Sequence, residues 1–316
     1  MKKIAIAAAV AALSAPAFAQ SSVTLWGRIN TSVESIKTNG GDRVASVINN
    51  NSRLGFKGTE DLGGGLKASF ALEHGLNSDD GRQTSSAFWN REASVQLAGD
   101  FGAIRLGRWT PGSYYATADY VSMHNHDTGT SEDKLYSGAG FTQTNKVGYF
   151  TPNIGGFNGE FTVHAGEGAP GEARGYDAAL NYDQGPLHLG AGYSKQGDAN
   201  QWAVRGLYEL GAWTFGGYAQ REDVSGLPGK DTRWIGRAAV MYTMGQSEYH
   251  FNIGGTKAGG ASFNSGRNGG KQWTVAYNYN LSKRTKVYAF YTAVDATTPN
   301  KQGDLNSFAL GVRHNF

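Results

Sequence analysis

Fixed charges at a regular spacing are the residues of this sequence best suited to do chemistry. Arg53 and Lys57 alternate with the apolar Leu54 and Phe56, so an extended strand would place both cations on the face opposite to the apolar side chains. Glu73 alternates in the same way with its own apolar neighbours. Charges gathered on one face attract, repel and orient ions and dipolar solutes. The pattern therefore predicts passage or binding of solutes rather than bond breaking.

Catalytic and metal chemistry has little support in the sequence. The segment His124-Asn125-His126-Asp127 contains metal-ligand residue types, but two imidazoles on one predicted loop supply only part of a coordination shell. The acidic pair at residues 60–61 precedes three glycines without the lysine and hydroxyl residue of a phosphate-binding loop. The seven histidines are scattered, so no serine hydrolase constellation is visible. We expect no catalytic residue, no metal and no cofactor.

The composition of the 316 residues excludes several classes of protein. Aromatic residues make up 12% of the chain, too many for a disordered protein, and the absence of cysteine excludes disulfide scaffolds and thiolate metal sites. After residue 19 no apolar run approaches the roughly 20 residues of a membrane-spanning helix. The 46 glycines and only 7 prolines fit many turns joined by uninterrupted strands.

The first 19 residues have the features of an export signal. Met1-Lys2-Lys3 is basic, residues 4–13 are apolar, and Ala17-Phe18-Ala19 fits a small-x-small cleavage site. We expect cleavage of residues 1–19, which leaves residues 20–316 as a single barrel domain. The loss of two lysines lowers the formal net charge from +3 to +1. A nucleic acid partner, which needs a strongly basic surface, is therefore not expected.

Period-2 alternation dominates the remaining chain. In residues 273–281 one face is Trp, Val, Tyr, Tyr and Leu, and the other is Thr, Ala, Asn and Asn. A strand with one apolar and one polar face needs an apolar neighbour and an aqueous one. We count roughly sixteen such strands, each near the length of about 9 to 11 residues that a tilted membrane strand requires.

The connections between these strands alternate in length. The short links are residues 60–65, 99–102, 152–156, 183–186, 211–212, 245–247 and 282–284. The long links are residues 36–51, 75–89, 110–144, 166–174, 195–200, 222–232, 257–271 and 293–305. Segregated short and long ends predict an all-β fold, a closed antiparallel transmembrane β-barrel without free edges. A soluble β-sandwich or β-helix is the alternative, but it gives no reason for aromatics at strand ends, as at Trp213, Trp234, Trp273 and Tyr279.

Four strings carry a family resemblance. They are SVTLWG at residues 22–27, SRLGFKGTEDLGGGLKA at residues 52–68, FGAIRLGR at residues 101–108 and GVRHNF at residues 311–316. In this order and spacing they resemble the general diffusion porins of Gram-negative β-proteobacteria. The resemblance implies a homotrimer of 16-stranded barrels among the lipids of the cell outer membrane, with short periplasmic turns, long extracellular loops and an inward-folded third loop. It also implies insertion by the barrel assembly machinery, which reads the C-terminal strand ending in Phe316.

The resemblance also implies which residues line the pore. In the family an arginine, a glutamate and a second arginine on the second, third and fourth strands line the constriction. The motifs SRLGFKG, ALEHG and WNREASV match these positions to Arg53, Glu73 and Arg91. We expect Lys57 and Arg28 to add positive charge to the same wall.

Two positions depart from a simple reading of that pattern. If Arg91 faced inward along a continuous strand, the polar side chains of Glu92, Ser94 and Gln96 would face outward, where lipid does not tolerate them. We therefore expect this strand to lie at the trimer contact. On the sixth strand, where the family often has a further arginine, the equivalent stretch offers only Thr142. A strong anion preference is for that reason not expected.

The predicted third loop, residues 110–144, is the longest and is the candidate constriction loop. Its charged residues include Asp119, Asp127, Glu132, Asp133 and Lys134. A basic wall would then face an acidic loop across the pore and set up a transverse field. The alternative is that these acids are simply solvated at the surface.

The function that we expect is a water-filled outer-membrane channel for passive diffusion of ions and small hydrophilic solutes. Its selectivity should be weak and should favour anions. An outer-membrane barrel enzyme such as a lipid hydrolase, and a plugged structural or adhesion barrel, are the alternatives from other classes.

Overall fold

The computed structural model describes residues 22–117, 128–136, 138–168, 173–223, 232–256, 269–296 and 303–316. The strands are β1 (Ser22–Thr38), β2 (Arg43–Asn49), β3 (Arg53–Gly63), β4 (Leu66–Gly75), β5 (Glu92–Gly99), β6 (Gly102–Arg108), β7 (Lys146–Phe150), β8 (Phe157–His164), β9 (Gly175–Gln184), β10 (Leu187–Gln196), β11 (Ala199–Leu210), β12 (Trp213–Asp223), β13 (Thr232–Met244), β14 (Ser247–Thr256), β15 (Gly270–Asn280), β16 (Thr285–Ala296) and β17 (Leu305–Asn315). A short helix α2 (Gly112–Ala116) and a 3-10 turn η1 (Gly129–Ser131) lie between β6 and β7 in the chain.

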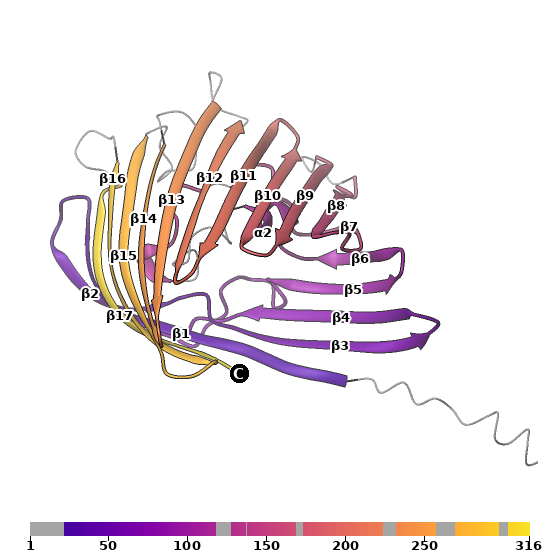
Figure 1. Ribbon diagram of the computed structural model, residues 1–316, viewed down its shortest axis with the longest axis horizontal. Coiled ribbons are helices and arrows are strands. Elements are labelled where there is room, and N and C mark those ends of the chain that lie inside the picture. The colour runs from indigo at the N-terminus through magenta and orange to yellow at the C-terminus, as the bar shows by residue number, and fades with distance from the viewer. Residues whose placement is uncertain are drawn as a thin grey trace, which may run out of the picture.

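All the strands belong to one antiparallel sheet that closes on itself (Figure 1). The ring closes where β17 pairs with β1, from Arg28↔Asn315 to Thr38↔Leu305. β2 and β3 both pair with β1 and are two parts of one barrel strand, interrupted by a bulge at residues 50–52. The seventeen segments therefore form the sixteen-stranded antiparallel barrel that the sequence predicts.

The last residue of the chain completes this closure. The backbone N–H of Phe316 donates to the carbonyl of Gly27, and the N–H of Gly27 donates to the carbonyl of Phe316, both at 3.0 Å. The Phe316 ring lies so close to Gly27 that a Cβ there would come within 2.4 Å of it. A glycine on β1 is thus required where the terminal aromatic ring packs.

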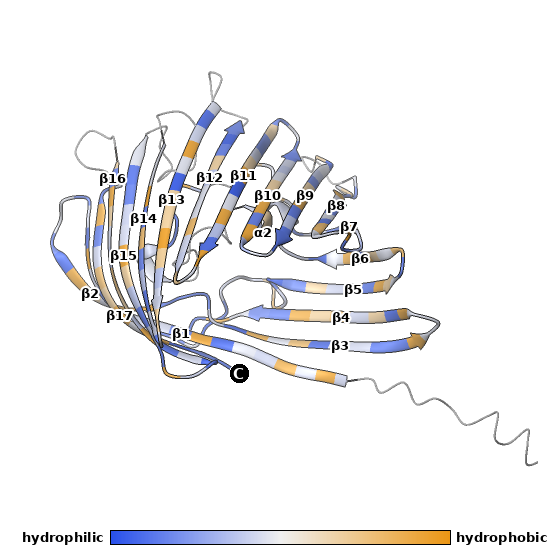
Figure 2. Cartoon of the chain, in the orientation of Figure 1, coloured by the Kyte–Doolittle hydropathy of each residue, from blue (hydrophilic) through white to orange (hydrophobic). Residues whose placement is uncertain are grey.

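Side chains alternate between the two faces of the barrel wall, as the bands of colour along the strands in Figure 2 illustrate. On β1, Ser32 and Glu34 are buried inside the barrel, whereas Val33 between them is 60% exposed on the outside. On β15, Thr274 is buried inside and Val275 is exposed outside. The outer wall is therefore apolar and the inner wall is polar, as a barrel with hydrocarbon outside and water inside requires.

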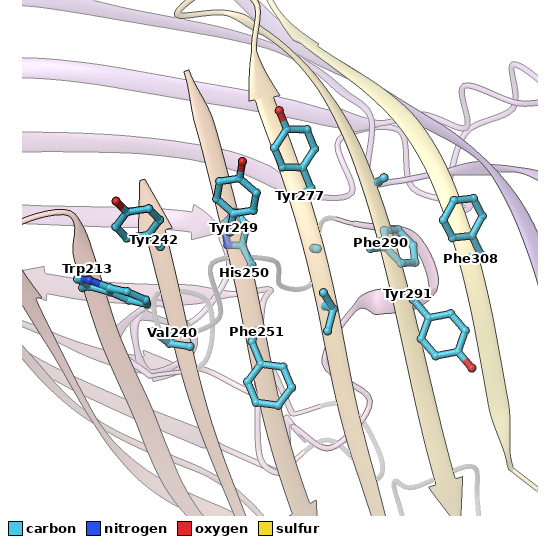
Figure 3. A pocket seen from close by; sticks show the side chains of 13 residues that line it. Trp213, Val240, Tyr242, Tyr249, His250, Phe251, Tyr277, Phe290, Tyr291 and Phe308 are labelled. Atoms are coloured by element: carbon cyan, nitrogen blue, oxygen red, sulfur yellow. The ribbon is translucent and has the colours of Figure 1, made fainter. Parts of the chain in front are cut away.

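Aromatic side chains form a row on the outer wall near the short turns. Ring centroids lie 4.7 Å apart between Trp213 and Tyr242, 6.5 Å between Tyr242 and Tyr249, and 5.2 Å between Tyr249 and Tyr277. Figure 3 shows these four rings side by side, bordering an apolar hollow of about 540 Å³ on neighbouring strands. Such a row on consecutive strands is the aromatic girdle expected at a membrane interface.

The connections follow the predicted alternation with two corrections. Residues 36–51, predicted as a long loop, are mostly strand, because β1 continues to Thr38, paired with β17 along this length, and β2 turns back to pair with it as a hairpin. Residues 195–200, also predicted as a long loop, contain a two-residue turn between β10 and β11. Both segments carry polar residues on both faces, and polar strands that extend beyond a membrane have no apolar face by which the sequence would reveal them.

No helix in the described residues combines the length and the apolar character that a membrane span requires.

The described parts of the third loop lie against the inner wall of the barrel. Helix α2 packs on β9 and β10, where the N–H of Ser113 donates to Asp177 Oδ1 at 3.2 Å and its hydroxyl lies 2.7 Å from Ser194 Oγ. Further along, the Thr130 hydroxyl of η1 donates to Glu34 Oε2 on β1 at 2.5 Å. The loop is thus held at widely separated points of the ring.

A buried ion pair supplies a further anchor of this loop. Asp133 Oδ1 lies 2.7 Å from Arg237 Nη2 on β13, and both side chains are fully buried. The Tyr218 hydroxyl donates to Asp133 Oδ2 at 2.6 Å, and the N–H of Lys134 donates to Gln272 Oε1 at 2.9 Å. Next to this network Leu135 packs in a buried apolar cluster with residues of β11, β12, β13 and β16.

The variant Asp133→Asn tests this anchor. Removing one partner of a buried ion pair destabilises by about 3 to 5 kcal/mol, because the other charge remains buried. We expect the loop to detach from β13 while the strand pairing of the barrel persists. Limited proteolysis of the folded protein in detergent should then cleave within residues 110–144 about tenfold faster or more.

The matched control is Asp80→Asn, because Asp80 and Arg82 form an ion pair that is 3.9 Å long and largely exposed on another loop. This control should cleave at the wild-type rate. An Asp133→Asn protein that resists the protease as wild type does would show that the ion pair does not hold the loop.

Candidate functional site

Two arginines converge on one glutamate at the inner wall. Arg91 Nε lies 2.5 Å from Glu73 Oε1, and Arg53 Nη1 lies 3.6 Å from the same oxygen. The Glu73 and Arg53 side chains are 12% and 13% exposed, and that of Arg91 is 27% exposed. The Arg53 Nε also donates to the carbonyl of Asn51 at 3.0 Å. The three positions that the family resemblance singled out are therefore brought together.

This group borders a hollow of about 380 Å³ between the barrel wall and the third loop. Arg53 and Arg91 line its wall side, and Tyr114, Glu132 and Tyr136 line its loop side. The Tyr136 hydroxyl lies 3.0 Å from Thr117 Oγ1 and accepts from Gln201 Nε2 at 3.2 Å. Burial raises the pKa of Tyr136 well above its usual value, so the phenol stays neutral at physiological pH. We name this space the wall–loop hollow.

The orientation predicted for the strand after Arg91 is wrong. Glu92 and Ser94 lie on the inner face of β5, where they pair in register with Glu73 and Ala71 of β4. Val95 is 53% exposed on the outer face. Arg91 reaches Glu73 because it precedes the first strand residue and lies in a bend, where the alternation of the strand does not apply. The reason for expecting this strand at a subunit contact is thereby removed.

Arg28 and Lys57 both lie on the inner face of the barrel wall. Arg28 on β1 is opposite Arg53 in register, and its Nε donates to Asn315 Oδ1 at 3.0 Å. Lys57 on β3 is exposed, with Nζ 5.9 Å from the centre of the Trp26 ring. Neither residue lines the wall–loop hollow, so each contributes charge to the interior at some distance from it.

The described acids of the third loop are paired with basic side chains, whereas the prediction treats them as unpaired negative charges. Glu132 borders the wall–loop hollow but forms an ion pair with Lys134 of the same loop. Asp133 is buried in its ion pair with Arg237. In the described part of the loop, acids and bases therefore largely offset each other. Asp119 and Asp127 lie outside the described residues, as does the segment His124-Asn125-His126.

Sequence reasoning missed Arg105 and Lys146. On the inner face of β6, Arg105 Nη1 lies 3.6 Å from Glu92 Oε1, and its Nε donates to Gln96 Oε1 at 3.0 Å. The alternation of Arg105 with apolar neighbours was a usable signal. Lys146 stands on β7 but is buried, with Nζ 4.4 Å from the Trp109 ring, so it does not face water. The phenols of the third loop gave no sequence signal, because irregular loops have no side-chain period.

No cluster of three or more histidine, cysteine or acidic side chains suited to a metal ion occurs within the described ranges. The chemistry that the described inner wall can perform is electrostatic. Guanidinium, ammonium, carboxylate and phenol groups face the interior of an apolar-walled barrel, where fixed charges act over a longer range than in open water.

Comparisons with known proteins agree with this geometry. Residues 5–299 match the family model described as Gram-negative porin. The chain is 33% identical to outer membrane porin protein 32 of Delftia acidovorans, with 99% of this chain and 95% of that protein aligned. It is 26% identical to an outer membrane porin protein of Bordetella pertussis over the whole length of both.

Solved structures are similar over nearly the whole chain. The anion-selective porin from Comamonas acidovorans superimposes with a TM-score of 0.80 at 27% identity, covering 94% of this chain and all of that one. The OmpT loop-deletion mutant of Vibrio cholerae, at 17% identity and a TM-score of 0.72, shares the fold. These likenesses point to a channel and not to an enzyme. The chain belongs to the Gram-negative porins and is an outer-membrane channel for the passive diffusion of small solutes.

Proposed function

We propose that the wall–loop hollow is the constriction of this channel and that the channel weakly prefers anions. The convergence of Arg53 and Arg91 on the single carboxylate of Glu73 is the observation that supports this best. Glu132 opposite carries a Lys134 partner, which weakens its repulsion of anions. The described groups around the hollow therefore carry more positive than negative charge.

Electrostatics give the size of the preference. A unit charge about 6 Å from the path of an ion changes the ion's energy by about 0.7 kcal/mol in water, which is roughly a threefold change in permeability. Low-dielectric walls increase this value and salt decreases it. The relative described as an anion-selective porin supports the same sign of selectivity.

We also propose the remaining features of the assembly. The export signal at residues 1–19 is removed, and residues 20–316 form the mature barrel. One of the similar solved structures is described as a trimer form, which supports a homotrimer here. The apolar outer wall and its aromatic girdle suit contact with outer-membrane lipids, and the terminal strand suits recognition by the barrel assembly machinery.

The double variant Arg53→Gln and Arg91→Gln tests the constriction. Removing one positive charge should lower the chloride permeability about threefold and raise the potassium permeability about threefold, so the chloride-to-potassium ratio should fall about tenfold per charge at low salt. The reversal potential in a salt gradient across a planar bilayer reports this ratio directly. Glu73→Gln should move the reversal potential in the opposite direction, because it removes the negative charge between the two arginines.

The control for charge alone is Arg82→Gln, since the Arg82 side chain is 83% exposed on the loop after β4. It should leave the reversal potential unchanged. Equal reversal potentials for wild type and the double arginine variant would show that Arg53 and Arg91 do not set the ion selectivity.

Deletion of Phe316 tests the terminal strand. Without this residue the hydrogen bonds to Gly27 and the ring packing on it are lost. We expect export to continue but the amount of heat-resistant trimer on denaturing gels to fall severalfold. Phe308→Ala, on the outer face of the same strand, should reduce it much less. Normal amounts of trimer from the truncated chain would contradict the role of Phe316 in assembly.

Alternatives from other classes are open to direct assay. A lipid hydrolase should release fatty acid in detergent, and a plugged barrel should give no conductance steps. We expect neither result from the purified protein.

A further inference from the structure

A second hollow, of about 330 Å³, lies on the inner wall between the wall–loop hollow and the short turns. Its position follows from the strands: β3 runs from Arg53 past Lys57 to Thr59 on the way to its turn, and β4 returns from Ser69 to Glu73. The two hollows share no lining residue. We name it the hydroxyl hollow after its lining, which consists of Ser22, Thr24, Lys57, Gly58, Thr59, Ser69, Phe70, Ala71, Glu92, Ser94, Gln96 and Arg105.

Small hydroxyl side chains make its floor. One row of the sheet pairs Thr24 with Lys57, Lys57 with Ala71, and Ala71 with Ser94. The next row pairs Ser22 with Thr59, Thr59 with Ser69, and Ser69 with Gln96. The Thr59 and Ser69 hydroxyls lie 3.0 Å apart and are exposed. Because a hydroxyl can rotate its hydrogen, this floor can present donors to a bound acceptor.

Two cations belong to this lining: Lys57 lies within the first row, and Arg105 lies next to Gln96 at the end of the second. Arg105 is occupied by Glu92 and Gln96, at 3.6 Å and 3.0 Å, and Glu92 also accepts from Ser94 Oγ at 2.7 Å. Lys57 is different: its Nζ lies 5.9 Å from the centre of the Trp26 ring, and no described carboxylate forms an ion pair with it. The charges of Arg105 and Glu92 offset each other, so the hydroxyl hollow has a net charge of about +1 that resides on Lys57.

We propose that the hydroxyl hollow is a binding site for a small oxyanion of the phosphate type, with Lys57 as its charged ligand. A tetrahedral oxyanion has several acceptor oxygens, which the ammonium group and the Thr59 and Ser69 hydroxyls can satisfy together. Chloride offers a single acceptor atom, so it cannot reach the ammonium group and both hydroxyls at once as the separate oxygens of an oxyanion can. The site therefore distinguishes oxyanions from chloride, which the constriction alone does not.

This proposal rests on the proposed anion preference. It adds a second anion site to the one at the constriction. An anion that leaves Arg53 and Arg91 meets Lys57 next, on the same strand as Arg53 and nearer to the turns. Passage through a pore requires binding that is strong enough to admit an ion and weak enough to release it, and successive weak sites meet both needs.

Inhibition of chloride current by inorganic phosphate tests the site. Phosphate is added to the turn side of the channel in planar bilayers at constant ionic strength and pH 7. We expect phosphate to reduce the chloride current of the wild type with a half-effect at millimolar concentration, and Lys57→Gln to raise that concentration about tenfold. Lys67→Gln is the matched control, because Lys67 is an exposed lysine of the same inner face outside the hollow.

A second variant separates the hydroxyls from charge. The pair Thr59→Val and Ser69→Ala keeps every charge, so the chloride current and the reversal potential should not change, whereas the phosphate effect should weaken severalfold. The site is refuted if phosphate leaves the wild-type chloride current unchanged at constant ionic strength, or if Lys57→Gln and Lys67→Gln behave alike. A protein without conductance or without anion preference would instead refute the proposed function.

Discussion

Backbone hydrogen bonding in an apolar solvent is the constraint on which this structure depends. A strand in hydrocarbon must pair each N–H and C=O group with another strand, and only a ring of strands leaves none at an edge. The pairing of β17 with β1, finished by the two bonds between Phe316 and Gly27, meets that requirement. Once the ring is closed, strict alternation follows, because each strand has hydrocarbon on one side and the interior on the other.

The closed ring then determines where charge can reside. Ionisable side chains in the wall must take inward positions, where they meet water or one another. A loop that enters this interior loses solvent and must replace it with partners, as Asp133 does with Arg237 and Tyr218. The polar wall of the interior thus also fixes the described parts of the third loop. The groups that anchor the third loop and the groups that face the solute are neighbours on the same inner wall.

Period and turn chemistry were sufficient to predict the strands and the barrel. Alternation alone assigns Arg53, Lys57 and Glu73 to the face opposite to their apolar neighbours. Alternation carries no information about side-chain direction where a strand ends. Arg91 lies in a bend before β5, so the parity of Glu92 and its neighbours says nothing about the direction of the arginine. Arg105 was overlooked although it obeyed the rule, and the tyrosines of the third loop obey no rule of spacing. Side chains placed by tertiary contacts carry no periodic signal in the sequence.

Counting the charges of a loop is for the same reason a poor guide to the field in a pore. Two opposite charges in contact act on a passing ion as a dipole, whose field falls faster with distance than that of a single charge. Glu132 with Lys134 and Asp133 with Arg237 are such pairs, so the acids of the described loop weigh less than their number implies. Lys57 has no carboxylate partner among the described residues, so it contributes more to the field in the pore than a lysine in an ion pair does. The field inside the barrel therefore depends on which charges are left without an opposite neighbour, and packing decides this rather than composition.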